Sequence, residues 1–263
     1  MQLRRKPFFL IAVVVLLLGN SGCQTVPETG RHQINIFSAS DEMQLGLASF
    51  TQMKKEVPIS RDLKANEQVQ RVGRRIAAVA NLPGAQWEFI VFDSKEANAF
   101  CLPGGKVGVY TGILPICRDD AGLATVIGHE VAHAVARHGG ERMTEAVGLQ
   151  VGTEVASSWV DQSRYAKYGP LMKNAWGLGT QLGVALPHSR LQESEADEIG
   201  LLYMARAGYP PAAAVEFWQR FADFNRQQGG DTPWFLRTHP TDAQRVERLR
   251  ALQPKAQSQF KPQ

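Results

Sequence analysis

Residues 128–140 read GHEVAHAVARHGG, a segment with three histidines within ten positions and a glutamate beside the first of them. On a helix, His129 and His133 lie four residues apart, so both imidazoles project from one face and can bind the same metal ion. Glu130 can reach a water molecule held by that ion. Zinc lowers the pKa of such a water toward about 7, and Glu130 can then act as general base in attack on a peptide carbonyl. The spacing predicts the metal-binding helix of a zinc peptidase.

The same HExxH pattern also arises by chance in unrelated proteins, where the helix would merely be rich in histidine. The flanking residues favour a metal site, because Val131, Ala132 and Val135 predict a buried helix. Histidines in such a helix need a polar partner, since an uncompensated buried polar group is costly. Another part of the chain must therefore supply the missing ligand.

The third ligand does not follow directly after the second histidine. A metzincin has a glycine three residues and a histidine six residues after that position. This chain has Ala136 and Gly139 there. His138 comes one residue too early, and we expect it to bond helix-end carbonyls or a neighbouring acid.

A second segment, SRLQESEADEIG at residues 189–200, offers the missing carboxylate. Glu193 and Asp197 are four residues apart on one face of a predicted helix, whereas Glu195 is expected to point away from both. A solvated acidic face is the simpler interpretation, but interspersed apolar residues make this helix amphipathic. Glu193 is therefore the expected third ligand, and Asp197 is expected to orient a ligand histidine through its second ring nitrogen.

Three motifs in order, HEVAH, SRLQESEAD and FLRTHPTDAQRVERL, resemble the zinc metallopeptidase family that includes HtpX, BepA, LoiP and the CAAX prenyl protease. The resemblance extends over residues 40–252. It implies an α+β, mostly helical zincin-type domain with a small β-sheet beside the active-site helix, and one zinc ion (Zn2+) per chain. Glu193 and Asp197 match the family's Glu-x-x-x-Asp motif. The transmembrane region of HtpX and the tetratricopeptide domain of BepA have no expected counterpart, so single-domain LoiP-like lipoproteins are the expected nearest members.

The resemblance also implies roles for residues outside these two helices. Asn98, Ala99 and Phe100 match the edge strand along which substrate backbone is held by strand addition. His239 matches a histidine that in BepA-like members can occupy the fourth zinc position and hold the enzyme inactive. Arg245 matches an arginine placed to stabilise the tetrahedral oxyanion. A catalytic role for His239, together with Arg245, is the alternative to inhibition.

Hydrophobic periodicity predicts the elements that must position these residues. It indicates helices at residues 41–56, 66–80, 119–138, 141–160, 165–186, 190–207, 211–226 and 241–251, with Asn66 capping the second and Gly139-Gly140 ending the third. Three short strands are predicted at residues 87–94, 98–105 and 106–114. The domain is expected to span residues 41–252, with a disordered tail at 253–263.

The first residues predict export. Arg4, Arg5 and Lys6 precede an unbroken apolar run of eleven residues. Such a segment is typical of a signal peptide, here residues 1–22, and is too short to span a bilayer as a helix.

Cys23 is the predicted site of lipidation. Small residues precede it as in a lipobox, although Asn20 stands where that motif usually has leucine, and export with plain cleavage is the alternative. A lipid on Cys23 would attach the chain to a membrane on its periplasmic side, and a polar linker at 23–40 would connect this anchor to the domain. The outer membrane is favoured, because Gln24 is not the aspartate that typically retains lipoproteins at the inner membrane.

Two cysteines remain if Cys23 carries lipid. Cys101 and Cys117 are then an even pair in an oxidising compartment, which predicts a disulfide between them. Two buried free thiols are the alternative.

The charge balance gives no support to nucleic-acid binding. The chain has 29 basic and 25 acidic residues, a net charge of +4. Three basic residues fall in the signal peptide, so the remainder carries 26 against 25, or +1. The basic isoelectric point therefore depends largely on the signal segment.

These features together predict a zinc metalloendopeptidase of the bacterial cell envelope that cleaves unfolded or misassembled envelope proteins, with the outer-membrane assembly machinery as a candidate partner. A chaperone-like or adaptor protein with a non-catalytic zinc site is the rival hypothesis. Glu130 favours the enzyme, because a scaffold needs no general base. A structural zinc site would also usually be rich in cysteine, and no cysteine lies near these motifs.

Overall fold

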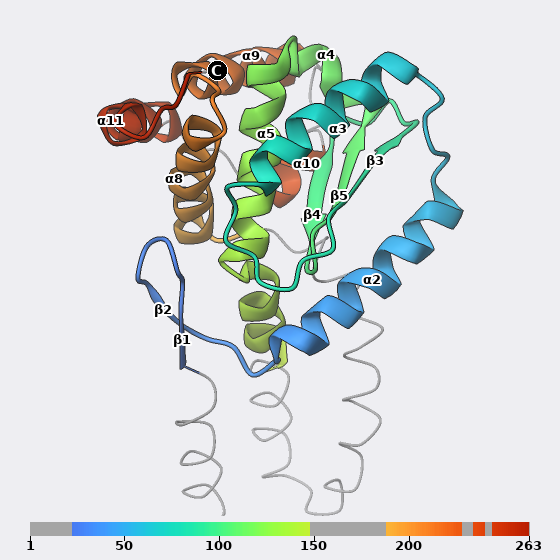
Figure 1. Cartoon of the computed structure of the whole chain (residues 1–263), viewed down its shortest axis with the longest axis vertical. Helices are drawn as coiled ribbons and strands as arrows, with labels where there is room; N and C mark the ends of the chain where they lie inside the picture. The colour runs from blue at the N-terminus through green and yellow to red at the C-terminus, as the bar shows by residue number, and fades with distance from the viewer. Residues whose placement is uncertain (1–22, 148–187, 228–233, 240–243, 263) are drawn as a thin grey trace, which may run out of the picture.

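The computed structural model describes residues 23–147, 188–227, 234–239 and 244–262. Figure 1 shows helix α5 in the middle of this part, with α8 on one side and a three-stranded sheet on the other. The predicted signal peptide, the predicted helix at 165–186 and most of the predicted helix at 141–160 lie outside the described residues.

The elements confirm the predicted α+β class, a mostly helical domain with a small sheet beside the metal-binding helix. In chain order they are β1 (Cys23–Thr25), β2 (His32–Ile34), α2 (Ala39–Glu56), α3 (Leu63–Ala77), β3 (Glu88–Phe92), β4 (Ala99–Leu102), β5 (Lys106–Tyr110), η1 (Thr111–Ile113), α4 (Leu114–Cys117), α5 (Asp120–Val135), α8 (Arg190–Arg206), α9 (Ala212–Gln227), α10 (Trp234–Thr238) and α11 (Arg245–Gln257). No helix among the described residues is both long and apolar enough to cross a membrane.

Helix α5 is buried along nearly its whole length, in keeping with its run of small and apolar residues. Asp119 caps its start, because its side chain accepts a hydrogen bond from the Gly122 amide at 2.8 Å. The helix contacts α8, α3, β4 and α9. A helix covered on so many sides has little solvent-facing surface, so its polar side chains must find partners inside the protein.

Helices α5 and α8 come into close contact at a pair of glycines. A Cβ atom on Gly128 would lie 3.0 Å from the Gly200 carbonyl oxygen, and a Cβ atom on Gly200 would lie 2.8 Å from the His129 amide nitrogen. A larger residue at Gly200 would therefore push the helices apart. This close packing brings the histidines of α5 within reach of the acids of α8.

The three-stranded sheet has the order β3-β5-β4, with β5 parallel to β3 and antiparallel to β4. Strand β4 is therefore an edge strand, and it lies against α5. Gly104 and Gly105, with φ of 84° and 80°, make the turn from β4 to β5 in a backbone conformation that favours glycine. The predicted edge position of residues 99 and 100 agrees with this topology.

Helix α3 begins earlier than predicted, because a different residue caps it. The Asp62 side chain accepts hydrogen bonds from the amides of Lys64 and Ala65 at 2.9 and 3.2 Å. Asn66, the predicted cap, instead donates its side-chain amide to the carbonyls of Ser60 and Asp62. Both are polar residues with capping chemistry, and the helix starts after the first one.

The predicted linker at 23–40 is wrong, because this segment forms an ordered hairpin. Strands β1 and β2 pair antiparallel, with Cys23 opposite Ile34. Gln33 is buried and donates to the Ala136 carbonyl at 2.8 Å. Side-chain hydrogen bonds to the body of the protein hold a polar sequence in place here, and such bonds leave no hydrophobic periodicity to read.

The predicted glycine cap at the end of the metal-binding helix is also wrong. Helix α5 ends at Val135, with Ala136 as its cap residue, and Arg137 adopts the left-handed conformation with φ of 57°. Its guanidinium forms an ion pair with Glu42 at 2.8 Å, which stabilises an uncommon conformation for a bulky residue. Residues 138–147 are helical again. Gly140 is needed for packing, because a Cβ atom there would collide with Glu42.

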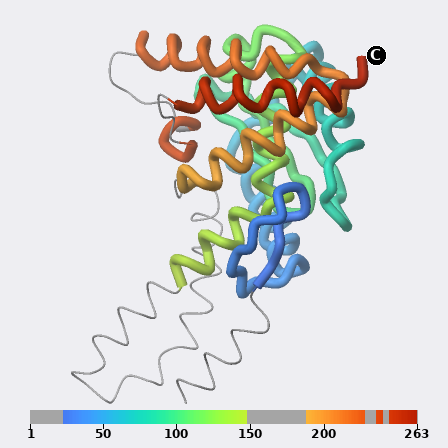
Figure 2. The backbone as a smooth tube through the Cα atoms, turned by 90° about the vertical axis from the view of Figure 1, so that its left-hand side faces the viewer, coloured from blue at the N-terminus to red at the C-terminus, as the bar shows by residue number. Residues whose placement is uncertain are grey.

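The predicted disordered tail is wrong over most of its length. Helix α11 continues to Gln257, Ala256 is fully buried, and Phe260 packs against the core. The Gln259 side chain accepts a hydrogen bond from Arg206 at 2.6 Å. Figure 2 shows α11 running beside α9 across one end of the molecule, and the two helices are in contact.

The predicted disulfide is wrong, because Cys101 and Cys117 are free thiols. Burial, and then the charge of Glu130, raise the pKa of the Cys101 thiol, which lies on β4 and lines the same pocket as Glu130 of α5. Cys117 lies just before the start of α5. Cys101 is thus near Glu130, whereas Cys117 is near Asp120, ten residues earlier in the same helix. Ten residues span roughly 15 Å along a helix, whereas a disulfide needs Cα atoms within about 7 Å of each other. An even number of cysteines does not reveal this separation.

Candidate metal centre

Helix α5 supplies the first two donor groups. The rings of His129 and His133 project from the same face, and their Nε2 atoms lie 3.1 Å apart. Both side chains are almost completely buried. Spacing of four residues produces this convergence, as the sequence predicted.

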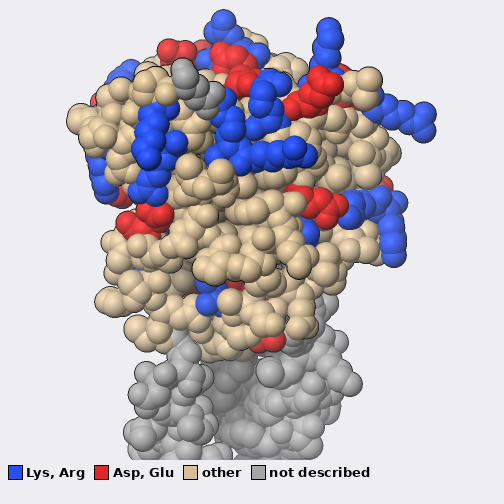
Figure 3. All heavy atoms as spheres, in the orientation of Figure 1, with Lys and Arg blue, Asp and Glu red and all other residues tan. Residues whose placement is uncertain are grey.

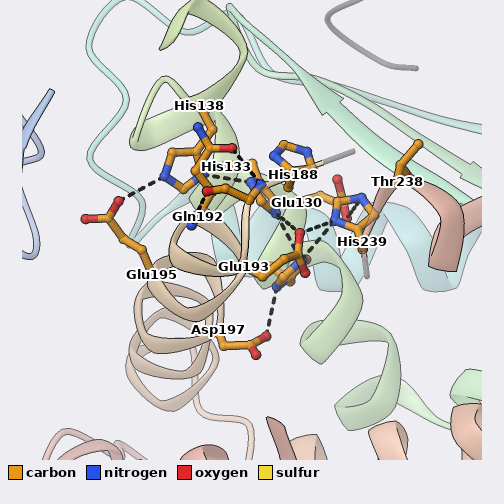
Figure 4. Close-up of polar contacts among 12 residues, drawn as sticks. Glu130, His133, His138, His188, Gln192, Glu193, Glu195, Asp197, Thr238 and His239 are labelled. Atoms are coloured by element: carbon orange, nitrogen blue, oxygen red, sulfur yellow. Dashed lines mark hydrogen bonds and ion pairs between the residues drawn. The ribbon is translucent and has the colours of Figure 1, made fainter. Parts of the chain in front are cut away.

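Helix α8 supplies a carboxylate to the same point. One oxygen of Glu193 lies 3.3 Å from His133 Nε2 and the other lies 3.4 Å from His129 Nε2. Glu193 is buried, and Figure 4 shows it pointing toward the histidines. The predicted third ligand is thus beside the first two.

His239 approaches from the end of α10. Its Nδ1 lies 2.8 Å from Glu193 Oε1 and 3.3 Å from His129 Nε2. One donor atom from each of His129, His133, Glu193 and His239 lies within 4.8 Å of the others. Two or three imidazole nitrogens and a carboxylate oxygen are the donors of catalytic zinc sites, so the residues fit a zinc ion.

Asp197 and Arg245 support this group from behind. Asp197 Oδ1 lies 3.1 Å from His129 Nδ1, which leaves His129 Nε2 to face Glu193. Arg245 donates to Asp197 at 2.6 Å and to Glu193 at 3.0 Å, and its guanidinium lies 3.3 Å from the centre of the Trp218 ring. Arg245 is therefore placed to position the two carboxylates.

Glu130 lies beside the metal-binding group without belonging to it. Burial raises the pKa of its carboxyl group above the usual range. Among the described residues, Oε1 of Glu130 has no hydrogen-bonding partner, and His239 Nε2 is 3.4 Å away. A buried carboxylate with a free oxygen next to a metal-binding group is what a general base requires.

The charges of the group reflect competition between burial and neighbours. Burial alone would raise the pKa of Glu193, but His239, His129 and Arg245 lower it well below its usual range. Burial alone would lower the pKa of His129, but Glu193 and Asp197 raise it to about 9. Burial lowers the pKa of His133 well below its usual range. The negative charges of Glu193 and Asp197 thus favour a positive charge at the place where the donor atoms converge.

A pocket connects this group to the edge strand. Its walls come from α2, β4, α5 and the segments around Arg142, His188 and His239, and they include Glu130 and His133. Asn98, Ala99 and Phe100 line it, although the Phe100 ring packs into an aromatic cluster with Phe50 and Phe92. Phe100 therefore offers the pocket little beyond its backbone.

Two buried basic residues at this pocket were missed by the sequence interpretation. The His188 ring lies 3.7 Å from that of His133 and 4.8 Å from that of His239, centroid to centroid. Arg142 contacts His188, and burial lowers the pKa of its guanidinium to about 10. Arg142 lines the pocket, whereas Arg245 does not. A histidine immediately before the helix cap Ser189 was the available signal, but it belongs to no recognised spacing.

Glu195 points away from Glu193 and Asp197, as expected (Figure 4). Its side chain is buried and accepts hydrogen bonds from His138 at 2.9 Å and from Arg31 at 2.7 Å. His138 does bond a neighbouring acid, as expected. Burial alone would raise the pKa of Glu195, but these partners and Thr29 lower it to about 2.

The sequence matches the model of peptidase family M48 over residues 63–253. Mitochondrial metalloendopeptidase OMA1 of Schizosaccharomyces pombe is 38% identical over 189 residues, which cover 72% of this chain and 53% of that protein. OMA1 of Danio rerio is 31% identical over 242 residues, covering 88% of this chain and 50% of that protein. The beta-barrel assembly-enhancing protease of Escherichia coli is 26% identical over 230 residues, covering 84% and 46%.

A helix with the HExxH spacing, crossed by a helix that supplies a glutamate, defines a zincin-type metallopeptidase site. With its sequence match, the chain belongs to peptidase family M48, and its candidate metal-binding group contains His129, His133 and Glu193. The chain spans about half the length of the curated relatives that it matches.

Proposed function

We propose that this chain is a zinc-dependent endopeptidase of the bacterial cell envelope that cleaves unfolded or misassembled envelope proteins. The observation that carries the proposal is the convergence of His129, His133 and Glu193 beside the buried, partly unpartnered carboxylate of Glu130. The name of the Escherichia coli relative, a beta-barrel assembly-enhancing protease, supports a task in envelope quality control.

The chemistry divides between the metal and the acid beside it. Zinc, when bound, lowers the pKa of a coordinated water toward neutrality and polarises the peptide carbonyl. Glu130 accepts the proton of the attacking water and returns it to the leaving amine. The raised pKa of Glu130 suits the first step, because a carboxylate with a higher pKa is a stronger base toward the proton of the water.

An extended substrate is proposed to bind along β4. Only one side of this strand pairs within the sheet, so the other can accept an added strand whose backbone supplies the hydrogen bonds. Asn98, Ala99 and Phe100 line the pocket next to Glu130. Backbone recognition places few demands on substrate sequence, which suits unfolded chains of many kinds.

His239 is proposed to act as an inhibitory switch. Its Nδ1 lies 2.8 Å from Glu193 Oε1 and 3.3 Å from His129 Nε2, within the space that a metal ion and its water would share. An imidazole in the fourth zinc position would exclude the water that Glu130 activates. Substrate entering along β4 would have to displace it.

The same contact favours the rival function. A site held closed by four protein ligands is typical of structural zinc. If His239 never leaves, the pocket can hold client proteins without cutting them, as a chaperone-like or adaptor protein would. Cleavage by the purified protein decides between the two.

The location and partners are also proposals. We infer periplasmic export by residues 1–22 and lipidation of Cys23, with anchoring at the outer membrane near the assembly machinery. Cys23 is exposed, as a modification site must be. Metabolic labelling with an alkyne fatty acid, compared with a Cys23→Ala variant, tests the anchor.

The central test is hydrolysis of an unfolded protein. A reduced and alkylated model protein is incubated with the purified chain, with the chain plus a zinc chelator, and with the chelated chain after zinc is restored. Fragments in the first and third samples alone support the endopeptidase. Zinc binding without cleavage, together with suppression of client aggregation, would favour the chaperone instead.

A further inference from the structure

A buried chain of polar contacts leads from His133 to the N-terminal hairpin. His133 Nδ1 lies 2.8 Å from His138 Nδ1, and His138 Nε2 lies 2.9 Å from Glu195 Oε2. Figure 4 shows these three residues in line, on the side of His133 away from Glu193. At the far end, Glu195 accepts hydrogen bonds from Thr29 and from Arg31 in the hairpin.

The protons in this series of contacts can be assigned by starting from Glu195, the acid at its far end. A carboxylate can only accept hydrogen bonds, and a neutral imidazole carries one donor and one acceptor nitrogen. The oxygens of Glu195 accept from Thr29 and, in an ion pair at 2.7 Å, from Arg31, as a carboxylate does, so Nε2 of His138 must carry the proton of its bond to Glu195. Nδ1 of His138 is then the acceptor, and its partner, Nδ1 of His133, must be the donor.

This assignment determines which nitrogen of His133 is free. With the proton on Nδ1, the lone pair is on Nε2, the atom that lies 3.3 Å from Glu193 and 3.1 Å from His129 Nε2. A metal ligand must offer a lone pair, and the group bonded to its second nitrogen decides which one it offers. Asp197 has the same role for His129 without an intervening histidine, because its Oδ1 lies 3.1 Å from His129 Nδ1.

We propose that His138 and Glu195 are positioning residues that fix the tautomer and ring orientation of the metal ligand His133, and that Arg31 holds Glu195 in place for this task. The inference rests on the metal site of the proposed function and extends it to a second layer. It also gives the N-terminal hairpin a part in the site, since Arg31 lies 2.7 Å from both Glu195 and Glu141.

Two other interpretations of the same residues make different predictions. Glu195 could serve only as the ion-pair partner of Arg31, in which case the histidine tautomers would not depend on it. Alternatively, His133, His138 and His188, which each offer a donor atom within 4.8 Å of the others, could hold a second metal ion. The experiments below separate all three.

The first measurement uses the wild-type chain. Metal-free protein with 15N-labelled histidine is studied by NMR, in which protonated and unprotonated ring nitrogens differ strongly in chemical shift. We expect His133 to carry its proton on Nδ1 and His138 to carry its proton on Nε2. A proton on the other nitrogen of either ring would overturn the proposal, and no variant needs to fold for this result.

The second measurement compares two acids that share one partner. Glu195→Ala and Glu141→Ala each remove an ion pair with Arg31, but only Glu195 contacts His138. Zinc dissociation constants are determined by competition with a chelator. We expect Glu195→Ala to raise the constant roughly 10- to 100-fold, the usual effect of losing a group behind a metal ligand. Glu141→Ala should leave it unchanged.

The outcomes separate this proposal from the proposed function. Failure of the wild-type chain to bind zinc would contradict the zinc endopeptidase. Tight binding by the wild type and equally tight binding by Glu195→Ala would overturn only the positioning pair. Two zinc ions per wild-type chain would assign His138 to a second metal site and would also overturn it.

Discussion

Glu130 and Glu193 are two buried glutamates a few ångströms from the same histidines, yet their surroundings give them different charges. Glu193 is close to His239, His129 and Arg245, and its pKa falls well below the usual range. Glu130 has fewer compensating contacts, and burial raises its pKa. A ligand must stay ionised and a base must accept a proton, so the two environments match the two roles.

Replacement of Glu130 by glutamine tests its role as base. The amide has nearly the same shape but cannot accept the proton of the attacking water, so we expect hydrolysis to fall roughly 10²- to 10⁴-fold. Zinc content should stay at the wild-type level, because Glu130 is not in the metal-binding group. Both are measured on the same preparation. Substantial turnover by the variant, free of contaminating protease, would rule out this assignment.

His239→Ala tests the inhibitory switch. Three donors, His129, His133 and Glu193, remain to hold zinc after the substitution. We expect zinc to be retained and basal cleavage of the unfolded protein, or self-degradation, to increase. Loss of cleavage with full zinc occupancy would instead make His239 a catalytic residue that contacts the reacting groups.

At the scale of whole elements, periodicity and ligand spacing predict what local sequence controls. The HExxH helix, the helix carrying Glu193 and the three strands all occur close to their predicted ranges. The errors arise where long-range contacts decide. Arg137 is held by Glu42, and the polar hairpin is held by bonds such as that from Gln33 to the Ala136 carbonyl. Pairs about 100 residues apart leave no local pattern.

The candidate site shows the same division. His129, His133 and Glu193 were predicted because their chemistry repeats at helical spacing or follows the family motif. The partners of Glu195 were not predicted, because spacing along one helix does not reveal that His138 and Arg31 approach this face of it. His188 and Arg142 follow no spacing rule, and only the packing of their segments brings them together.

The glycine contact between α5 and α8 gives a prediction at this scale. A methyl group at Gly200 would lie 2.8 Å from the His129 amide nitrogen, so Gly200→Ala should force the helices apart and destabilise the fold by about 1–3 kcal/mol. Zinc affinity should fall with it, because Glu193 moves away from His129 and His133. Denaturant unfolding and chelator competition measure the two effects.

Gly139→Ala is the matched control. Gly139 is also helical, but nothing lies within 4 Å of a Cβ atom built there. Alanine at such a site should stabilise the protein by about 0.4–1 kcal/mol. Equal effects of the two substitutions would show that helix propensity, not the close contact of α5 and α8, controls the result.

Over the whole molecule, the charged side chains on the surface (Figure 3) and the buried histidines form two separate sets of titrating groups. Figure 3 shows Lys and Arg side chains over the upper part of one face, with Asp and Glu among them. The formal net charge is only +4. By contrast, the buried group around the metal-binding residues contains five of the six histidines, all except His32. Titration of these buried histidines should therefore dominate the dependence of stability on pH.

The metal-free protein should lose stability as the pH falls from about 6.5 to about 5. Burial lowers the pKa of His133, His138 and His188, so all three are neutral when folded but take up protons when unfolded, near pH 6.5. His129, with a pKa of about 9, stays protonated when folded but takes up its proton near pH 6.5 when unfolded, so it opposes the trend by up to about half a proton at pH 6.5 and by almost nothing near pH 5. Glu130 has a raised pKa and opposes the trend by up to one proton.

The sign follows from which state binds more protons. The excess of protons on the unfolded chain grows to about two near pH 5, so the free energy of unfolding should fall by roughly 2–3 kcal/mol per pH unit at most. Denaturant midpoints of the chelated protein at pH 7.5, 6.5, 6.0 and 5.5 measure it. A flat profile would mean that the buried histidines are already charged in the folded protein. His138→Phe, which removes one of the three titrating rings, should make the slope shallower by about one proton.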